Sequence, residues 1–449
     1  MRVLLERDNV NPNAADEHGR TPLCEAVEKG HEGVVRILLE RSDVNPNTAD
    51  GYGETPLSLA AEIGYDGIVR ILLERSDIDP NTIDGNGQTP LYLAAENGNE
   101  RVVRILLERG DVNPNTADKY GQTPLYLAAK NGHEEVMRIL LGRNDVNPNI
   151  VDKHGQTPLS FAAEDGDEET VRILLGRSDA NPNTATTFFD QTPLSLAAEN
   201  GHEEVARILL ERSDVNPNTP DKYGQTPLCL AAMNGHEGVV RRVLERSDVN
   251  LDEADKFGMT PLSKAAQNGH EGVVKMLLER NDVNPEVANR HNETPLSLAA
   301  ESGHEGVVRI LLERSGVNPN TSDKYGQTPL YLAAENGHEG VMRILLERND
   351  VNPNTTNKNG RTPLFLAAEM GDEEVMGILL ERNDVNLDIT DHNGQTAAEW
   401  AAQNGYDRIA KLLRDLADFT PRYAASLQPT DSRSPKPSES CEPPDKRIC

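Results

Sequence analysis

The sequence has little cysteine, which limits the classes of protein it can be. Only four of its 449 residues are Cys, too few for a disulfide framework. Cys24 and Cys229 occupy the same position of a repeated pattern, six repeats apart. At roughly 10 Å per stacked repeat they lie about 60 Å apart, far beyond the reach of a disulfide. Free thiols are typical of a reducing compartment, so we expect a cytoplasmic or nuclear location.

Positive charge is also scarce. The chain has 45 Lys and Arg against 74 Asp and Glu, a net charge of −29. This balance argues against nucleic acid and against an anionic membrane as the main partner. The negative charge is spread evenly over the repeats, which indicates a solvated surface. The sequence shows no signal peptide, transmembrane run or prenylation pattern.

Motifs that carry chemistry are missing. The sequence contains no nucleophile elbow, phosphate-binding glycine loop, HExxH, paired CxxC or calcium loop. Histidine followed by Glu recurs at His31, His133, His202, His236, His270, His304 and His338. Successive members lie one repeat apart, roughly 10 Å, too far to share a metal ion, so we expect them to stabilise turns. We therefore predict no catalytic, cofactor-binding or metal-binding residues, and not an enzyme.

What the chain does contain is one unit copied many times. Thr-Pro pairs begin at Thr21, Thr55, Thr89, Thr123, Thr157, Thr192, Thr226, Thr260, Thr294, Thr328 and Thr362, and Thr396-Ala397 closes the series. The step is 34 residues, except for 35 between Thr157 and Thr192. A fixed period of this length predicts a stack of small units that lean on their neighbours.

The residues of one unit predict two short helices and a turn. Thr328 can cap a helix that Pro329 begins, and Leu330, Ala333 and Ala334 share one face of it. Asn-Gly at 336–337 ends this helix, and an apolar second helix follows over about 339–348. Pro353 in the Asn-Pro-Asn segment then forces an extended arm and a tight turn, which we call the finger. The predicted fold class is all-α with short β-turn fingers.

The pattern Gly-x-Thr-Pro-Leu-x-Leu-Ala-Ala at 326–334, followed by Gly-His, Val-x-x-Leu-Leu and Asp-Val-Asn, resembles the ankyrin repeat. The resemblance covers roughly residues 1–417 and implies an α-solenoid. Several features depart from the family pattern, two of which bear on the surface. The unit is one residue longer than usual, and the usual His after Thr-Pro-Leu is replaced, as at Cys24, Ser58, Tyr92 and Phe365.

We expect an ankyrin-repeat array over residues 1–417 and a disordered Pro/Ser-rich tail over 418–449. Residues 1–20 form a partial repeat, because Met1 aligns with the interior of a second helix. This start favours a truncated fragment of a longer protein; the alternative is a half-unit that frays. Residues 396–417 are the expected C-terminal capping repeat, since Thr396 and Glu399 form a capping box.

The resemblance implies non-catalytic protein–protein binding, as a scaffold or recognition array. We expect the array to be a monomer. The Asn-Pro-Asn variant is similar to ankyrin arrays of filamentous fungi, some of which follow NACHT-type ATPase modules. The alternative function is therefore the C-terminal sensor array of a larger signalling ATPase. In either case the resemblance implies protein partners on the fingers and inner helices.

A row of cations and aromatics at the fingertips is the candidate partner-binding stripe. Its members are Lys119, Tyr120, Lys153, His154, Lys222, Tyr223, Lys256, Phe257, Lys324 and Tyr325, with Arg290 and His291 at one further tip. The position after Thr-Pro-Leu adds Tyr92, Tyr126, Tyr331 and Phe365, expected on the first helix near the fingers. Aromatic and cationic side chains contribute strongly to interfaces. The alternative is a solvated turn that duplication has copied without use.

The finger at 184–190 breaks the pattern, since it lacks the finger glycine and carries Phe188 and Phe189. Adjacent side chains in an extended segment face opposite ways, so at least one ring should be exposed and could anchor a partner. The competing expectation, which we favour, is that the longer finger folds over and buries both rings against the tip at 153–154 or at Tyr223.

Overall fold

The computed structural model describes residues 11–426, with side chains described as far as Asp418. The chain divides into two compact units between Lys324 and Tyr325. The expected partial repeat at 1–20 and the expected tail at 418–449 therefore lie partly outside the described residues.

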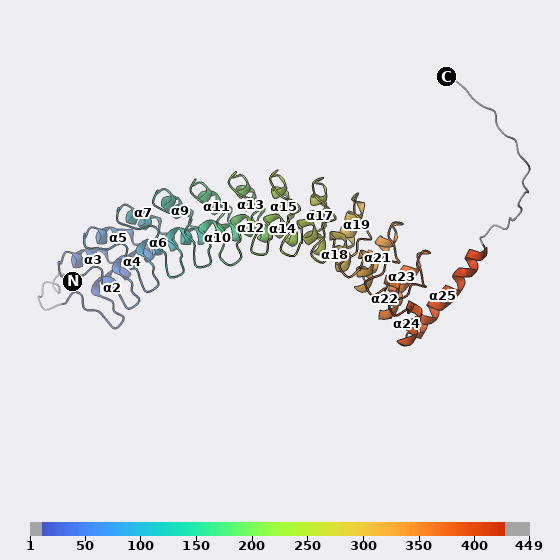
Figure 1. Cartoon of the computed structure of the whole chain (residues 1–449). Coiled ribbons are helices and arrows are strands. Elements are labelled where there is room, and N and C mark those ends of the chain that lie inside the picture. Colours follow the sequence, from blue (N-terminus) through green and yellow to red (C-terminus); the bar gives the residue numbers. More distant parts are fainter. Residues whose placement is uncertain (1–10, 427–449) are drawn as a thin grey trace, which may run out of the picture. The chain divides into compact units, whose positions relative to one another are not determined.

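The first unit repeats one helix pair along its described length. Its first helices are α2 (Pro22–Glu28), α4 (Pro56–Ile63), α6 (Pro90–Glu96), α8 (Pro124–Lys130), α10 (Pro158–Asp165), α12 (Pro193–Asn200), α14 (Pro227–Asn234), α16 (Pro261–Gln267) and α18 (Pro295–Ser302). Its second helices are α3 (Glu32–Leu39), α5 (Asp66–Leu73), α7 (Glu100–Leu107), α9 (Glu134–Leu141), α11 (Glu168–Leu175), α13 (Glu203–Leu210), α15 (Glu237–Leu244), α17 (Glu271–Leu278) and α19 (Glu305–Glu313). Within this unit the first helices lie side by side in one row and the second helices in another (Figure 1).

The second unit continues the pattern and closes it. Its helices are α20 (Pro329–Glu335), α21 (Glu339–Leu346), α22 (Pro363–Met370), α23 (Glu373–Leu380), α24 (Ala397–Gln403) and α25 (Asp407–Ser426). Helix α25 continues past residue 417, where we expected the array to end. Among residues 11–426 there is no strand, only an isolated antiparallel bridge between Thr390 and Thr396. The predicted all-α class is confirmed.

The Thr-Pro pair starts each first helix as predicted. In α6 the hydroxyl of Thr89 accepts a hydrogen bond from the backbone N–H of Tyr92 at 3.1 Å, and Pro90 occupies the first helical position. This satisfies one of the N–H groups that a helix start leaves unpaired. In α24 Thr396 and Glu399 form the predicted capping box, with backbone-to-side-chain distances of 2.9 and 3.2 Å.

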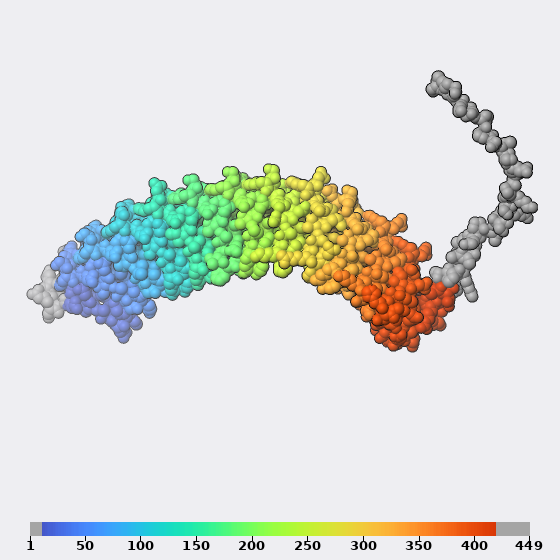
Figure 2. All heavy atoms as spheres, viewed as in Figure 1, coloured from blue at the N-terminus to red at the C-terminus, as the bar shows by residue number. Residues whose placement is uncertain are grey.

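The first helices form the core of each unit. Six of the seven residues of α6 are buried, which leaves only its last residue, Glu96, partly exposed. Ala94 and Ala95 are fully buried because their small side chains allow α4 and α8 to approach on either side. In the space-filling view the repeats of the first unit pack as successive bands, each against the next (Figure 2). A repeat therefore completes its core only with its neighbours.

The second Asn of most Asn-Pro-Asn segments links its repeat to the next one. The Nδ2 of Asn115 donates to the carbonyl of Asp145 at 2.6 Å, and its Oδ1 accepts from the backbone N–H of Asn147 at 2.8 Å. The side-chain amide thus pairs with one donor and one acceptor of the neighbouring arm, as a backbone amide would. The same pair of bonds recurs at Asn47, Asn81, Asn149, Asn183, Asn218 and Asn354.

A second link lies at the end of the second helices. The guanidinium of Arg177 donates to the carbonyls of Leu141 and Arg143 in the preceding repeat, at 2.9 and 2.8 Å. These carbonyls belong to the unpaired C-terminal end of α9, where a cation is favourable. Asp179 orients the guanidinium through a bond of 2.8 Å from Nε, and this bond lowers the pKa of Asp179. The recurrent Arg-x-Asp sequence, which follows the end of a second helix, therefore joins successive repeats.

Removal of the bridging amide should weaken one junction. We expect Asn115→Ala to lower the free energy of unfolding by about 1–3 kcal/mol, at about 0.5–1.5 kcal/mol for each of two hydrogen bonds. Urea unfolding measures the loss, and hydrogen exchange at the amide of Asn147 should speed up.

Asn113→Ala is the matched control, because its Oδ1 accepts only from Asn115 in its own repeat, at 3.0 Å. It should cost about half as much and leave exchange at Asn147 unchanged. Equal exchange at Asn147 in the two variants would contradict a bridging role for Asn115.

Candidate interaction surface

Most fingers are tight turns, each organised by one buried carboxylate. In the finger that holds Tyr120, Oδ1 of Asp118 accepts from the backbone N–H groups of Tyr120 and Gln122, at 2.8 and 2.9 Å. Gly121 completes the turn at φ +81°, and a Cβ there would lie 3.0 Å from the backbone of Asp152 in the next finger. The glycine is therefore required both by the turn and by the close approach of the neighbouring finger.

Successive fingertips are joined by single backbone hydrogen bonds. The N–H of Lys153 donates to the carbonyl of Tyr120 at 2.8 Å, and the N–H of Lys256 donates to that of Tyr223 at 2.9 Å. Each tip is thus fixed in register with the next one of its unit. Since the backbone groups face along the row, the aromatic side chains are left on the outside.

The predicted fingertip residues lie where the sequence places them. Tyr120 and Tyr223 are each 43% exposed, Phe257 is 61% exposed and Tyr325 is 55% exposed. Lys119, Lys153, His154, Lys256, Arg290 and His291 are exposed, whereas Lys222 and Lys324 are half-buried. Sequence reasoning missed Tyr52, which is 68% exposed at the same finger position. It was missed because Gly51 precedes it in place of a lysine.

Lysines of one tip lie over the rings of its neighbour. Nζ of Lys153 lies 4.3 Å from the ring centre of Tyr120, and Nζ of Lys222 lies 3.9 Å from that of Phe189. Lys119 and Lys222 also approach the rings next to them in sequence, Tyr120 and Tyr223, each at 5.1 Å. The lysines and aromatic rings of the row therefore contact one another, and these contacts hold the rings in place.

The four residues after Thr-Pro-Leu do not belong to this surface, and here the prediction is wrong. Tyr92, Tyr126, Tyr331 and Phe365 are at most 3% exposed. Packing in the array explains it: Tyr92 and Tyr126 form a cluster with Leu93 and Leu127 of adjacent first helices. The spacing of residues along one helix could not show that the first helix of the adjacent repeat covers this position.

The buried tyrosines support the fingers from beneath. The hydroxyl of Tyr92 donates to Oδ2 of Asp118 at 3.1 Å, so it holds the carboxylate that organises the next finger. In the second unit Nδ2 of Asn357 donates to the hydroxyl of Tyr331 at 2.9 Å. Burial raises the pKa of Tyr331 to about 12, so the hydroxyl stays protonated at neutral pH.

The irregular finger keeps the turn with different residues. Oγ1 of Thr186 accepts from the N–H of Gln191 at 3.2 Å, as the finger carboxylate does elsewhere. Asp190 takes the glycine position at φ +55°, a conformation that Asp tolerates better than most residues. Phe188 is 58% exposed and Phe189 is 46% exposed. The expectation that the finger buries both rings is therefore wrong, and the alternative of an exposed ring holds for both.

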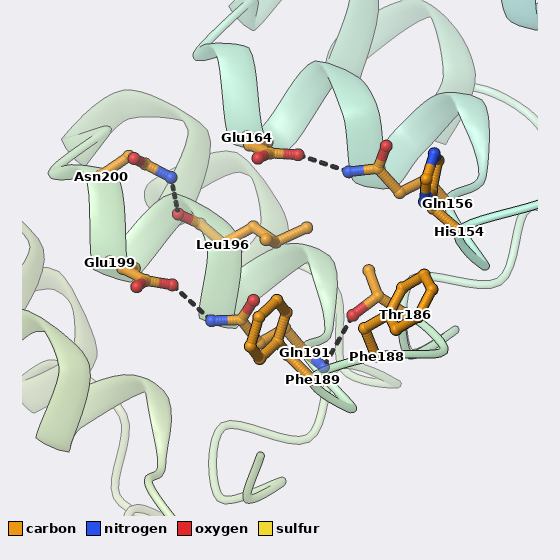
Figure 3. Close-up of a pocket in the computed structure, with 10 residues that line it drawn as sticks. All are labelled: His154, Gln156, Glu164, Thr186, Phe188, Phe189, Gln191, Leu196, Glu199 and Asn200. Atoms are coloured by element: carbon orange, nitrogen blue, oxygen red, sulfur yellow. Dashed lines mark hydrogen bonds between the residues drawn. The ribbon is translucent and has the colours of Figure 1, made fainter. Parts of the chain in front are cut away.

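A groove of about 390 Å³ opens beside these rings, between two successive repeats. Phe188, Phe189 and His154 border it, and α10 and α12 contribute Glu164, Leu196, Glu199 and Asn200 (Figure 3). The rings of His154 and Phe188 lie 5.7 Å apart. Two side-chain pairs, Gln156 with Glu164 and Gln191 with Glu199, lie on either side of Leu196 (Figure 3). In each pair the Gln amide donates to one carboxylate oxygen.

The recurring turn histidines join repeats. Nε2 of His133 donates to the carbonyl of Glu96 at 3.0 Å, and Nε2 of His236 donates to that of Glu199 at 2.9 Å. The sequence did not indicate this link to the previous repeat, and the expected turn-stabilising role stays a prediction. Within the described residues, no group of three or more His, Cys, Asp or Glu is placed to hold a metal ion. No described helix is both long and apolar enough to cross a membrane.

Comparison with protein families agrees with this architecture. A family model described as ankyrin repeats (3 copies) matches residues 1–84, 76–152, 144–221, 213–289, 281–357 and 349–422. The chain belongs to the ankyrin-repeat family. Ankyrin repeats are in general modules of protein–protein interaction, so the array has the fold of a protein-binding molecule. A search of curated proteins finds no match to the chain.

The carboxyl of Glu54 carries an unfavourable charge in the ankyrin array. Glu54 occupies the finger position that Gln156 and Gln191 hold elsewhere, and it faces Glu62 in place of a Gln–Glu pair. Burial, followed by the nearby carboxylates of Glu62, Asp50 and Asp84, raises the pKa of Glu54 to about 7. The protonated form is therefore favoured in the folded state, so folding stability falls as pH rises from 4.5 to about 7.

Replacement of this carboxyl should stabilise the array at high pH only. We expect Glu54→Gln to raise the free energy of unfolding at pH 8 by about 1 kcal/mol, a value reduced for the partial exposure of the group. At pH 4, below both pKa values, the effect should vanish. Urea unfolding at the two pH values measures it. Glu17→Gln, at a side chain that is 89% exposed, is the control for net charge; an equal gain from that control would contradict the assignment.

The exposed rings of the irregular finger should contribute little to stability. We expect Phe188→Ala with Phe189→Ala to change the free energy of unfolding by no more than about 0.5 kcal/mol per site, the usual range for surface substitutions. Phe365→Ala, at a ring that is 1% exposed, should cost about 3–5 kcal/mol. Thermal unfolding compares the variants, and a large loss in the double variant would show that the rings pack more tightly than their exposure indicates.

Proposed function

We propose that this ankyrin array is a non-catalytic recognition scaffold that binds protein partners along its fingertips and first helices. One observation carries the proposal: exposed aromatic rings gather at the fingertips. Among the described residues, thirteen large hydrophobic side chains are exposed. Seven of the thirteen, more than half, are aromatic side chains at the fingertips. They are Tyr52, Tyr120, Phe188, Phe189, Tyr223, Phe257 and Tyr325.

The backbone ladder supports this role. Rings on a row of tips that are fixed by hydrogen bonds lose little conformational freedom when a partner binds. Aromatic side chains on rigid supports are frequent centres of binding energy. The charge of −29 favours a protein partner over nucleic acid or an anionic membrane.

A monomeric array in the cytoplasm or nucleus fits the remaining observations. Cys24 and Cys229 are both free and buried, as is usual in a reducing compartment. The alternative function, a sensor array of a signalling ATPase, has no support in the described residues or in the family match, which names ankyrin repeats alone.

Loss of the fingertip tyrosines should weaken partner binding without unfolding the array. The test is the triple variant Tyr120→Ala, Tyr223→Ala, Tyr325→Ala, with a partner first captured by the unaltered full chain. We expect a loss of at least about tenfold in affinity by calorimetry, since a truncated aromatic at an interface commonly costs more than 1 kcal/mol, and unchanged thermal unfolding.

Leu412→Ala is the control for exposed apolar area, because Leu412 is 44% exposed on α25 and away from any finger. It should bind as the unaltered chain does. Unchanged affinity in the triple variant would contradict the proposal. It would favour the alternative, in which the fingertip row consists of solvated turns that duplication has copied without use.

A further inference from the structure

We propose that the groove beside Phe188 and Phe189 receives an arginine side chain from an extended segment of a protein partner. The inference rests on the proposed function and names the chemistry of one site on the same surface. It follows from the groove's shape, its rings and its uncompensated carboxylates.

The groove has the size and lining of a side-chain receptor. Its volume of about 390 Å³ falls within the range of about 300–1,000 Å³ that is common for ligand pockets. The apolar Leu196 lies within it, and the flat rings of Phe188, Phe189 and His154 border it (Figure 3). A planar guanidinium stacks on aromatic faces, and its aliphatic stem covers apolar surface.

Negative charge in the groove is not neutralised by the chain. Glu164 and Glu199 each accept one hydrogen bond from an uncharged Gln amide, and among the described residues neither forms an ion pair. A carboxylate can accept more than the single bond that the amide donates. A guanidinium offers five donors in one plane and stays charged at neutral pH. A neutral or acidic side chain would leave these carboxylates uncompensated.

The ring of Phe189 already accepts a cation. Nζ of Lys222 lies 3.9 Å from its centre, although Lys222 does not line the groove. Phe189 is 46% exposed, so part of its side chain remains open to solvent beside this lysine. A partner's arginine would add a second cationic contact at a site whose other rings, those of Phe188 and His154, have no lysine over them in the described structure.

A corresponding groove in the second unit shows how the chain neutralises such a site. There Arg361 takes the position of Gln191, and its Nη1 donates to both oxygens of Glu369 at 2.6 Å. The guanidinium also lies 5.2 Å from the ring of Phe365. The array therefore accommodates an arginine against this carboxylate and an aromatic ring. At the first groove Gln191 leaves that place open to an arginine from outside.

The test uses the full chain labelled with 4-fluorophenylalanine and the peptide acetyl-Gly-Ala-Arg-Ala-Gly-amide. The chain has six Phe, so ¹⁹F resonances can be assigned by single substitutions. We expect the arginine peptide to shift the resonances of Phe188 and Phe189 saturably and to leave that of the buried Phe365 in place. The same peptide with citrulline, which keeps the shape but not the charge, should bind at least about tenfold more weakly, because charge-assisted hydrogen bonds are lost.

Gln191→Arg is the decisive variant, because it copies the pairing of Arg361 with Glu369. It should fold as the unaltered chain does and reduce affinity for the arginine peptide at least about tenfold. Gln225→Arg adds the same charge at the equivalent finger position of the next repeat, outside the groove, and should bind within about twofold of the unaltered chain.

Equal binding of the citrulline peptide, or undiminished binding by Gln191→Arg, would overturn the inference. So would an arginine peptide that moves neither resonance. These outcomes concern the groove alone, since the partner affinity of the fingertip triple variant tests the proposed function separately.

Discussion

The structure depends on burial that no repeat can achieve alone. In α6 every residue except the last is buried, and this is possible only because α4 and α8 cover its two sides. The buried alanines give the first helices little apolar surface of their own, so close approach of the neighbours must supply the rest. A single repeat in water would expose this helix. Stability in the array is therefore a sum over junctions, and changes at one junction should be felt mainly by the repeats that share it.

Apolar packing between near-identical helices does not by itself fix their register, and the polar links do so. Three kinds of polar link recur along the first unit: the fingertip backbone bond, the turn histidine and the bridging Asn amide. Each joins a donor in one repeat to an acceptor in the next one. Because a hydrogen bond weakens steeply with misalignment, the three together tolerate little sliding. Where the second Asn becomes Asp252, the acceptor remains, bonded by the N–H of Asn284, but the donor is lost and burial raises the pKa of the carboxyl.

The sequence predicts the elements of one repeat well because those elements are local. Thr-Pro caps, Asn-Gly helix ends and the capping box at Thr396 depend on residues within a few positions of one another. What it did not predict depends on the neighbouring repeat. Tyr92 is buried by the next first helix, and Asn115 bonds to an arm that lies about one repeat further on. The exposed tips were predictable for the same reason that caps were: a turn at the end of a finger has no neighbour above it.

The irregular finger shows which residues the array can vary. At this tip the N–H of Thr187 donates to His154, and the carbonyl of Phe189 accepts from Lys222, so both neighbouring tips keep their usual bonds. The residue between these two fixed points is Phe188, and its backbone takes no part in the link to either tip. An added residue has therefore entered the row between the donor and the acceptor of one tip without a change of register. Its side chain is then directed outward, where Phe188 lies beside the groove. The row of backbone hydrogen bonds that fixes the fingertips thus allows an added residue whose side chain a partner can reach.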